Sequence, residues 1–257
     1  MKKEILAILK KQEKSLLSGK WIAKQLGVSR AAVWKAVDAL RKDGYDIRAV
    51  TNGGYYLIDS PQVLEEKELK RLLHTSCIAS RFDIFESVTS TNDVAKEAAR
   101  TGAPEGYTVI ANQQTQGKGR RGKSFYSPRQ GGIYFSIVLR PKEHFQQLNL
   151  ITVIAAVAVT RALRTATGVD AKIKWVNDVL CGGKKLCGIL TEAGFEVESG
   201  APDYAVCGIG INLYPAELPE ELNAIVTNLT DCGAKEISAG NLLAEVLKEF
   251  EHAYLHE

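Results

Sequence analysis

The stretch from Gln113 to Ser124 constrains this chain most, because it alternates glycine with positive charge. Its three glycines and four Lys or Arg residues cannot lie in a hydrophobic core. Glycine allows positive φ and close approach of the backbone to a ligand, while the interleaved cations supply donors for carboxylate or phosphate oxygens. The apolar, β-branched run that begins at Tyr107 predicts a buried strand before this loop. A solvated surface loop is the common alternative for a charge run, but the position directly after a strand favours a loop for an anionic ligand.

The same stretch matches the P-loop pattern at Gly117, Gly122, Lys123 and Ser124, which is typical of nucleotide triphosphatases. That pattern requires a helix after the serine. Residues 125–132 instead contain a proline, two aromatic residues and a pair of glycines, which oppose helix formation. We therefore interpret the match as chance and predict that no helix follows.

Composition places the chain among ordinary soluble proteins of one or two domains: it has 257 residues, of which 45% are hydrophobic and 25% charged. Five cysteines are scattered without a Cys-x-x-Cys pair, which favours buried thiols in a reducing compartment over disulfides or a zinc site. The N-terminus lacks an apolar signal core, and the longest apolar run, 151–159, is too short to cross a bilayer. We therefore expect a cytoplasmic protein without a membrane partner.

Positive charge is concentrated at the N-terminus. Residues 1–60 hold twelve Lys and Arg against six Asp and Glu, a net charge of +6, so the total of +3 leaves −3 for the rest of the chain. This local excess suggests a polyanionic partner for the first segment, because phosphate contacts dominate nucleic-acid affinity.

The first two helices of this segment are predicted from apolar spacing and helix-end signals. Apolar residues between Ile5 and Leu17 predict the first helix. Ser18 is a suitable N-cap for a second helix over 20–26, and Gly27 ends that helix.

A third helix is expected over 30–43, between an N-cap at Ser29 and a stop at Gly44. With the second helix it makes a helix-turn-helix, in which the later helix enters the major groove of DNA. Two β-prone runs around 51–54 carry a hairpin signal, which predicts the wing of a winged helix. The candidate DNA-binding residues lie at the start of the third helix: Ser29, Arg30, Ala31, Trp34 and Lys35.

The alternative is a winged helix that binds only protein, which many such modules do. The local charge and the cations on the third helix favour DNA. We place this domain at residues 1–60, where Ser60-Pro61 closes it. A connecting helix is expected within 61–81, and a second domain over 82–257.

The second domain begins with a strand candidate over 82–86 and a polar cluster, 87–92, before a helix over 93–100. Ser and Thr serve well as N-caps, which is the simpler explanation of the cluster. The other explanation is a set of donors and acceptors that line a polar pocket.

A second polar cluster combines two lysines, an indole, an amide and a carboxylate within 172–178. It indicates either a binding site or the polar face of a β-hairpin that turns at Gly182-Gly183, with equal weight. Glycines in the run 206–213 suggest close approach of a ligand or a backbone. Further elements are predicted in this order: strand 133–140, helix 148–167, strand 186–192, strand 206–213 and helix 238–255. Strands and helices without strict βαβ alternation predict an α+β fold with a mixed sheet.

Five short motifs follow the winged helix. They are Ser90-Thr91-Asn92, Gln114-Thr115-x-Gly117-Lys118-Gly119-Arg120-Arg121-Gly122, Lys174-Trp175-Val176-Asn177-Asp178, Lys185-Leu186-Cys187-Gly188-Ile189-Leu190 and Gly208-Ile209-Gly210-Ile211-Asn212. In this order they resemble the biotin protein ligases, specifically the class that also represses the biotin operon. Each motif alone is weak, but the resemblance covers nearly the whole chain.

The resemblance implies a catalytic domain related to the class II aminoacyl-tRNA synthetases and a reaction in two steps. The carboxylate of biotin attacks the α-phosphate of ATP, which carries Mg²⁺, to give biotinyl-5′-AMP and pyrophosphate. A lysine of the biotin carboxyl carrier protein then takes the biotinyl group. The resemblance also implies repression at operator DNA by a homodimer that forms when biotinyl-AMP is bound.

Roles for single residues are implied in the same way. Four polar side chains are implied to bind the ureido ring of biotin: Ser90, Thr91, Asn92 and Gln114. Three residues of the glycine loop are implied to line the valeryl chain and the phosphate: Lys118, Gly119 and Arg120. Gly117 is implied as a further binding residue of the same loop. Lys185 is implied as the main catalytic cation, with Lys118 and Arg120 beside it. The residues implied to bind on the nucleotide side are Lys174, Asn177, Asp178 and Asn212. No resident metal is implied, and Asp178 is the candidate ligand for the Mg²⁺ that ATP carries.

Three departures from the family pattern bear on these roles. Lys118 stands where arginine is commonest, which keeps the charge but loses bidentate geometry. Val176 replaces the usual proline and changes local stiffness. The sequence ends at Glu257, where family members continue into a small β-barrel, so we expect the barrel and its contributions to ATP affinity and acceptor docking to be lacking.

Two other functions stay open. One is a transcription factor that senses biotin or biotinyl-AMP with little or no ligase activity. The other is a ligase for lipoate or octanoate, which share the fold; the polar residues 90–92 and Gln114 argue against it, because a lipoyl ring has no ureido group to satisfy.

Overall fold

The computed structural model describes residues 1–11, 16–42, 45–50, 54–59, 64–140, 148–195, 202–216, 218–234 and 238–256. The chain divides into two compact units, residues 1–63 and 64–257. Several sequence predictions lie outside the described residues: the helix stop at 43–44, the turn residues 51–53, the domain boundary at 60–61 and the C-terminal residue 257.

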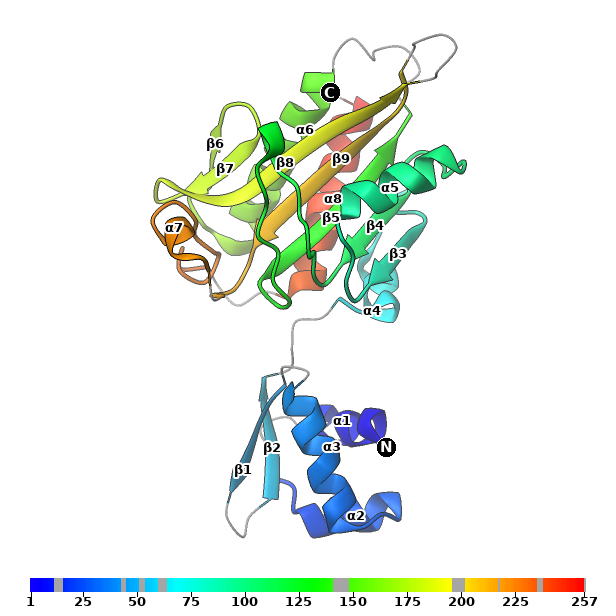
Figure 1. The fold of residues 1–257 in the computed structure, drawn as a ribbon, viewed down its shortest axis with the longest axis vertical. Coiled ribbons are helices and arrows are strands. Elements are labelled where there is room, and N and C mark those ends of the chain that lie inside the picture. The colour runs from blue at the N-terminus through cyan, green and yellow to red at the C-terminus, as the bar shows by residue number, and fades with distance from the viewer. Residues whose placement is uncertain are drawn as a thin grey trace. The chain divides into compact units, whose positions relative to one another are not determined.

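The first unit is a winged helix (Figure 1). It consists of α1 (Lys2–Lys11), α2 (Gly19–Leu26), α3 (Arg30–Lys42), β1 (Asp46–Val50) and β2 (Gly54–Asp59). Ser18 Oγ accepts a bond from Trp21 N at 3.1 Å, so it is the N-cap of α2 as predicted. The apolar stripe of α3 is buried and meets residues of α1, α2 and both strands: Val33, Val37 and Leu40 with Ile5, Ile22, Ile47 and Leu57.

The first predicted helix extends too far toward the C-terminus, because it included Leu17. Leu17 is not helical; it exchanges two backbone bonds of 2.8 Å with Tyr55 of β2. Its side chain is buried in the core of this unit. The prediction of a core position is therefore right for Leu17, whereas Leu16 is 48% exposed. A β-bridge, not a helix, brings Leu17 to the core. β1 and β2 pair antiparallel with Val50 opposite Gly54, which confirms the hairpin.

The second unit is built on a mixed sheet of seven strands, which confirms the predicted fold class. Its strand order is β3-β4-β5-β9-β8-β7-β6, with β3 and β4 parallel and the other neighbours antiparallel. The strands are β3 (Phe82–Phe85), β4 (Thr108–Ala111), β5 (Gly132–Leu139), β6 (Lys172–Lys174), β7 (Asp178–Cys181), β8 (Lys184–Phe195) and β9 (Pro202–Asn212). No helix occurs within 123–131, all of which the structure describes, so the P-loop match was rightly rejected.

Helices cover both faces of this sheet (Figure 1). α6 (Leu148–Thr167) and α8 (Ala239–His256) pack on one face, and α5 (Thr91–Arg100) covers the β4–β5–β9 part of the other. By length and composition α6 is apolar enough to cross a membrane, but its Ala155, Val159 and Leu163 are fully buried in the main core. A short helix, α7 (Glu220–Asn223), lies in the segment before α8.

The predicted connecting segment contributes to the second unit. Its helix is α4 (Glu66–Leu72), which packs on α8 and buries Leu69 in the main core. Leu64 N also donates to Asn112 Oδ1 at 3.1 Å, directly after β4. The apolar face of α4 is therefore buried within the second unit.

Glu251 on α8 fixes the turn that follows α4. Its carboxylate accepts backbone bonds from Ser76, Cys77 and Ile78 at 2.9, 2.7 and 2.8 Å. Partial burial acts to raise the pKa of Glu251, but these bonds outweigh it and lower that pKa below its ordinary value.

Replacing Glu251 with glutamine is expected to lower the free energy of unfolding by about 1–2 kcal/mol at neutral pH, because bonds to a charged acceptor are lost. The folded-state pKa is lowered, so the advantage of the wild type is present at neutral pH and disappears as the pH falls through that pKa. Urea titrations at about pH 7 and about pH 3 measure both values. Glu249→Gln on the same helix is the control, and an equal Glu251→Gln deficit at both pH values would contradict the assignment.

Candidate active site

A pocket lies where side chains are missing from one face of the sheet. Along β9, Ile209 and Ile211 enter the core, and Gly208 and Gly210 fall at the alternate positions. Gly188 of β8 is the cross-strand partner of Gly210. These three glycines line the pocket and leave its floor open.

The floor has no room for side chains. A Cβ added to Gly208 would lie 1.9 Å from Asn92 Oδ1, and one added to Gly210 would lie 2.4 Å from the ring of Phe125. The groups that approach Gly208 and Gly210 closely are therefore side chains of the pocket, whereas the sequence predicted a ligand or a neighbouring backbone.

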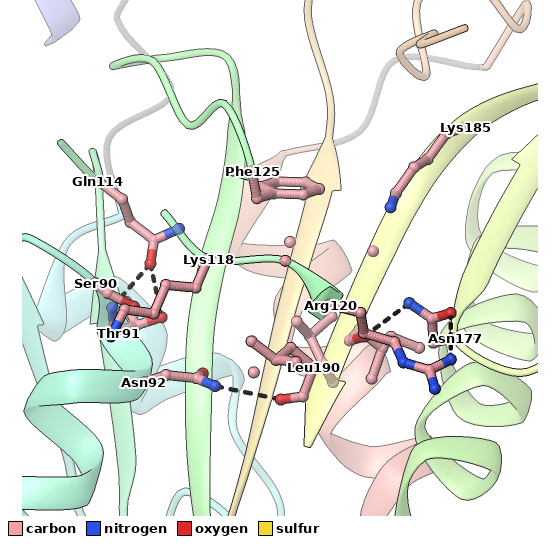
Figure 2. Close-up of a pocket in the computed structure, with 16 residues that line it drawn as sticks. Ser90, Thr91, Asn92, Gln114, Lys118, Arg120, Phe125, Asn177, Lys185 and Leu190 are labelled. Carbon is pink, nitrogen blue, oxygen red and sulfur yellow. Dashed lines mark hydrogen bonds between the residues drawn. The ribbon is translucent and has the colours of Figure 1, made fainter. Parts of the chain in front are cut away.

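One end of the pocket is polar and belongs to the start of α5 (Figure 2). Ser90 occupies the N-cap position, but its hydroxyl caps none of the described N–H groups of the helix. Thr91 donates from its backbone N and its hydroxyl to Gln114 Oε1, at 2.8 and 3.0 Å, and Gln114 Nε2 donates to Ser127 Oγ at 2.8 Å. Ser90, Thr91 and Gln114 line the pocket, so the cluster is both a helix start and a polar wall.

Asn92 continues this polar wall. Its Nδ2 donates to Leu190 O at 3.3 Å and to Glu192 Oε2 at 2.7 Å, while its Oδ1 lies 2.6 Å from the hydroxyl of Ser136. Asn92 and Ser136 are 4% and 0% exposed, so these bonds replace water almost completely.

The glycine-rich loop is held by its own backbone. Gly119 N donates to Lys123 O at 2.7 Å, and Phe125 N donates to Gly117 O at 2.8 Å. A Cβ on Gly117 would lie 2.3 Å from Phe125 O, so this glycine shapes the loop and lies outside the described lining of the pocket. Gly119, by contrast, lines the pocket.

Lys118 of the loop is tied to α5. Its Nζ lies 2.6 Å from Asp93 Oδ1, and Lys96 Nζ lies 3.2 Å from the same oxygen. Partial burial acts to raise the pKa of Asp93, but the bonds from Lys118 and Lys96 lower it below its ordinary value. The loop therefore reaches the polar end through a charged bond that a ligand anion would compete for.

The other end of the pocket is cationic. Lys185 Nζ lies 2.7 Å from Asp178 Oδ1 and 5.8 Å from the centre of the Phe125 ring. Arg120 donates to Asn177 Oδ1 at 3.2 Å. Figure 2 shows Lys185, Arg120 and Asn177 across the pocket from Ser90, Thr91 and Asn92, with Phe125 between the two groups.

The β7–β8 hairpin positions these groups. It turns at Gly182 and Gly183, which have φ of +57° and +80°, as a tight two-residue turn requires. The hairpin interpretation of the 172–178 cluster is therefore confirmed. The hairpin also brings Asn177, Asp178 and Lys185 to the cavity walls, where the binding-site interpretation stays a prediction. Trp175 is 78% exposed and belongs to neither described cavity lining.

A wider cleft of about 1180 Å³ adjoins the pocket and shares Arg120, Phe125 and Lys185 with it. Lys174, Asp178 and Asn212 line this cleft only. Segment 224–228 also lines the cleft. It bonds to both backbone groups of Lys185: Lys185 N donates to Ile225 O at 2.8 Å, and Thr227 N donates to Lys185 O at 2.9 Å. The cleft is large enough for a ligand of nucleotide size.

Comparison with known proteins agrees with this arrangement. Residues 84–212 match the biotin/lipoate A/B protein ligase family, and residues 2–56 match a helix-turn-helix domain family. The bifunctional ligase/repressor BirA of Bacillus subtilis is 36% identical over 99% of this chain and 78% of its own length. The protein of the same name from Escherichia coli is 28% identical over 92% of this chain and 71% of its own.

The chain belongs to the biotin protein ligase family. A solved structure agrees: the biotin protein ligase from Aquifex aeolicus, in complex with biotin and ATP, superposes with a TM-score of 0.58 and 33% identity, covering 68% of this chain and 70% of that one. This biotin protein ligase therefore joins a ligase domain to a helix-turn-helix domain.

Several residues of the ligase pocket escaped the sequence analysis. Phe125 lies over the glycine floor, and Ser127 and Ser136 extend the polar wall. A serine in the middle of the apolar strand β5 was the one signal available for Ser136. Glu192 and Lys96 carried no local signal, because they reach the site only through contacts between distant segments.

The winged helix of this ligase presents one exposed face at the start of α3. Arg30, Ala31, Trp34 and Lys35 are exposed there, with Trp34 55% exposed. Ser29 serves a different purpose, since its Oγ accepts a bond from Ala32 N at 3.1 Å and so caps the helix.

The described residues offer few candidates for a metal site or a reactive thiol. Those residues contain no group of three or more His, Cys, Asp or Glu side chains that could hold a metal ion together. All five cysteines are described and are free thiols. Burial raises the pKa of Cys207 to about 12, so this thiol stays protonated and fits a buried apolar role.

Proposed function

We propose that this chain makes biotinyl-5′-AMP from biotin and ATP and transfers the biotinyl group to a lysine of a biotin carboxyl carrier protein. The observation that carries the proposal is the division of one pocket into two chemically different ends. Ser90, Thr91 and Asn92 offer hydrogen-bond groups suited to a ureido ring, and Lys185 and Arg120 offer charge suited to a carboxylate and a phosphate. A lipoyl or octanoyl group would leave the polar end unpaired.

In the first step the biotin carboxylate attacks the α-phosphate, a new C–O–P linkage forms, and the bond from that phosphate to pyrophosphate breaks. Two anions must approach, so catalysis depends on positioning and charge neutralisation. Lys185 stands where the pocket opens into the wider cleft, which is where carboxylate and α-phosphate would meet. The cleft itself would hold the rest of the nucleotide.

Mg²⁺ would arrive with ATP. The described lining of the cleft includes two carboxylates, Asp178 and Asp231. One or two carboxylates together with substrate phosphates are the usual protein environment of Mg²⁺, so the residues fit. Asp178, already paired with Lys185, would hold the ion near the phosphates, and the ion would supply charge neutralisation.

In the second step the amine of the acceptor lysine attacks the biotinyl carbonyl and AMP leaves. The mixed anhydride must be kept from water until then. The loop carrying Lys118, Gly119 and Arg120 lies along the pocket and suits that purpose. We place this reaction in the cytoplasm, where free thiols and the carrier protein coexist.

The test is to mix purified protein with biotin and ATP–Mg²⁺ without acceptor and to look for bound biotinyl-5′-AMP by mass spectrometry. Formation of the adenylate supports the proposal, and addition of carrier protein then tests transfer. Binding of biotin without adenylate would instead indicate a sensor. Preferential adenylation of lipoate or octanoate would overturn the choice of substrate.

We also propose that the winged helix binds operator DNA as a homodimer that forms with biotinyl-AMP. The support is the basic first segment, the exposed cations of α3 and the relatives named as repressors. Such binding is expected to weaken steeply with salt, because phosphate contacts release counterions.

Arg30→Ala is expected to weaken DNA binding about 10-fold or more, because it removes a cation from the start of the recognition helix. The probe is a duplex selected from a random library by the wild type with biotin and ATP, measured by fluorescence anisotropy at several salt concentrations. Arg100→Ala, on the ligase unit, is the control. Unchanged affinity in Arg30→Ala would contradict the proposed recognition helix.

A further inference from the structure

Two carboxamides form the polar end of the pocket, and each can present either an oxygen or an NH₂ group. For Gln114 the backbone decides, since Thr91 N–H can only donate and therefore faces Oε1. For Asn92 the deciding partner is a side chain, Glu192, which lies 100 positions away and accepts from Nδ2 at 2.7 Å.

Glu192 cannot present a donor to Asn92. Its other oxygen, Oε1, accepts from Lys96 Nζ at 2.9 Å, so both oxygens already accept a hydrogen bond. Partial burial acts to lower the pKa of Lys96, but its bonds to Glu192 and Asp93 raise it above the ordinary value, which keeps the ammonium protonated. Asn92 Nδ2 is therefore held toward Glu192 and Leu190 O, both acceptors.

Because Nδ2 of Asn92 is held in this direction, its Oδ1 must face the opposite way. Asn92 Oδ1 points over Gly208, where an added Cβ would lie 1.9 Å away, and it is 2.6 Å from Ser136 Oγ. A carbonyl oxygen has two acceptor sites, and the single hydroxyl hydrogen of Ser136, which Thr91 Oγ1 also faces at 2.7 Å, fills at most one of them. The pocket wall at this point therefore presents an acceptor, which suits an N–H of a ligand and repels a carbonyl.

We propose that Glu192, held by Lys96, is a positioning and specificity-determining residue that makes the Asn92 position of the pocket an acceptor for a ureido N–H. The inference rests on the proposed function for the identity of the ligand. Neither Glu192 nor Lys96 lines the pocket, so both act through Asn92.

Glu192→Gln tests this with almost no change of shape. A glutamine has one oxygen for two donors, Lys96 and Asn92, and the charged ammonium should win that oxygen. The glutamine NH₂ then faces Asn92 Nδ2, and the Asn92 amide should turn to present its own NH₂ to the pocket. Two donors then face each other in a site closed to water, and we expect the Kd for biotin to rise about 10- to 100-fold.

A second substitution should reverse this effect. In Lys96→Met/Glu192→Gln the ammonium no longer competes, so the glutamine can turn its oxygen toward Asn92 and restore the acceptor in the pocket. We expect the double variant to recover most of the lost biotin affinity. If Glu192 merely stabilised the fold, biotin affinity would fall further in the double variant, because the loss of Lys96 would add to the damage.

The measurements are calorimetric titrations of the full chain with biotin, with ATP affinity as an internal reference, and the side-chain amide resonance of Asn92 in ¹⁵N-asparagine protein. Weak biotin binding in Glu192→Gln with recovery in the double variant supports the proposal. Unchanged binding in Glu192→Gln, or no recovery, overturns it. If the wild type itself binds no biotin, the proposed function fails, and the Asn92 resonance alone decides: a shift in Glu192→Gln that the double variant reverses supports the network, and its absence overturns it.

Discussion

Lys185→Ala is expected to reduce the rate of biotinyl-5′-AMP formation at least about 1000-fold, equivalent to about 4 kcal/mol of transition-state stabilisation. Lys185 Nζ stands at the passage between the polar pocket and the wider cleft, 2.7 Å from Asp178 and over the Phe125 ring. Its backbone is fixed on both sides by Ile225 and Thr227. A cation held this firmly needs little reorganisation when charge develops on the phosphate.

Biotin affinity should change far less in this variant, because the polar wall that would hold the ureido ring lies at the opposite end of the pocket. Single-turnover release of pyrophosphate measures the first quantity, and calorimetric titration with biotin alone measures the second. Lys172→Ala, which removes an equal charge from the adjacent hairpin outside the pocket, is the control. Adenylation within about tenfold of the wild type in Lys185→Ala would contradict a role for this lysine in the reaction.

Gly208→Ala is expected to disrupt the polar wall of the pocket, because Gly208 has the shortest nearest contact for an added Cβ among the glycines that the structure describes. The added Cβ would lie 1.9 Å from Asn92 Oδ1 and 2.8 Å from Asn92 Cγ. Asn92 cannot withdraw without losing its bonds to Glu192 and Leu190, and packed interiors accommodate such changes poorly. We expect biotin affinity to fall about 100-fold, since overpacking and a displaced acceptor act together.

Calorimetric titration with biotin tests this, and thermal unfolding shows whether the fold survives. Gly240→Ala makes the same chemical change near the start of α8, where the added methyl group would meet the mobile end of the Leu72 side chain. That variant should bind biotin as the wild type does. A Gly208→Ala protein that folds and binds biotin within about threefold of the wild type would show that the floor of the pocket lies elsewhere.

The residues of the loop and of the helix starts were predictable because their signals are local. Ser18 caps α2 and Ser29 caps α3, as their positions before apolar helices indicate. The strand before the glycine loop and the hairpin turn at Gly182-Gly183 follow from β-branched runs and from glycine, whose preferences act over a few residues. Local signals also explain why Leu17 was wrongly predicted to be helical. Its apolar spacing indicated burial but did not decide the backbone conformation, which is a β-bridge to Tyr55.

The composition of the pocket wall was predictable only in part. The motifs named Asn92 and Gln114, and the structure places both at one end of the pocket. They did not identify Phe125 as the residue over the floor, nor Ser136 as the hydroxyl behind Asn92. A phenylalanine after a loop and a serine within a strand have many uses, and which use applies depends on what the sheet register sets opposite them.

The sequence by itself determined that a winged helix precedes a mixed-sheet domain and that a glycine-rich, positively charged loop follows a buried strand, because charge distribution, periodicity and glycine act through neighbours along the chain. Only the tertiary structure decided which groups share a site and which way Asn92 faces. Asn92 and Glu192 are 100 positions apart and meet because α5 packs on the sheet that carries β8. Orientation of a buried amide is set by the partner across such a contact, and no local pattern specifies that partner.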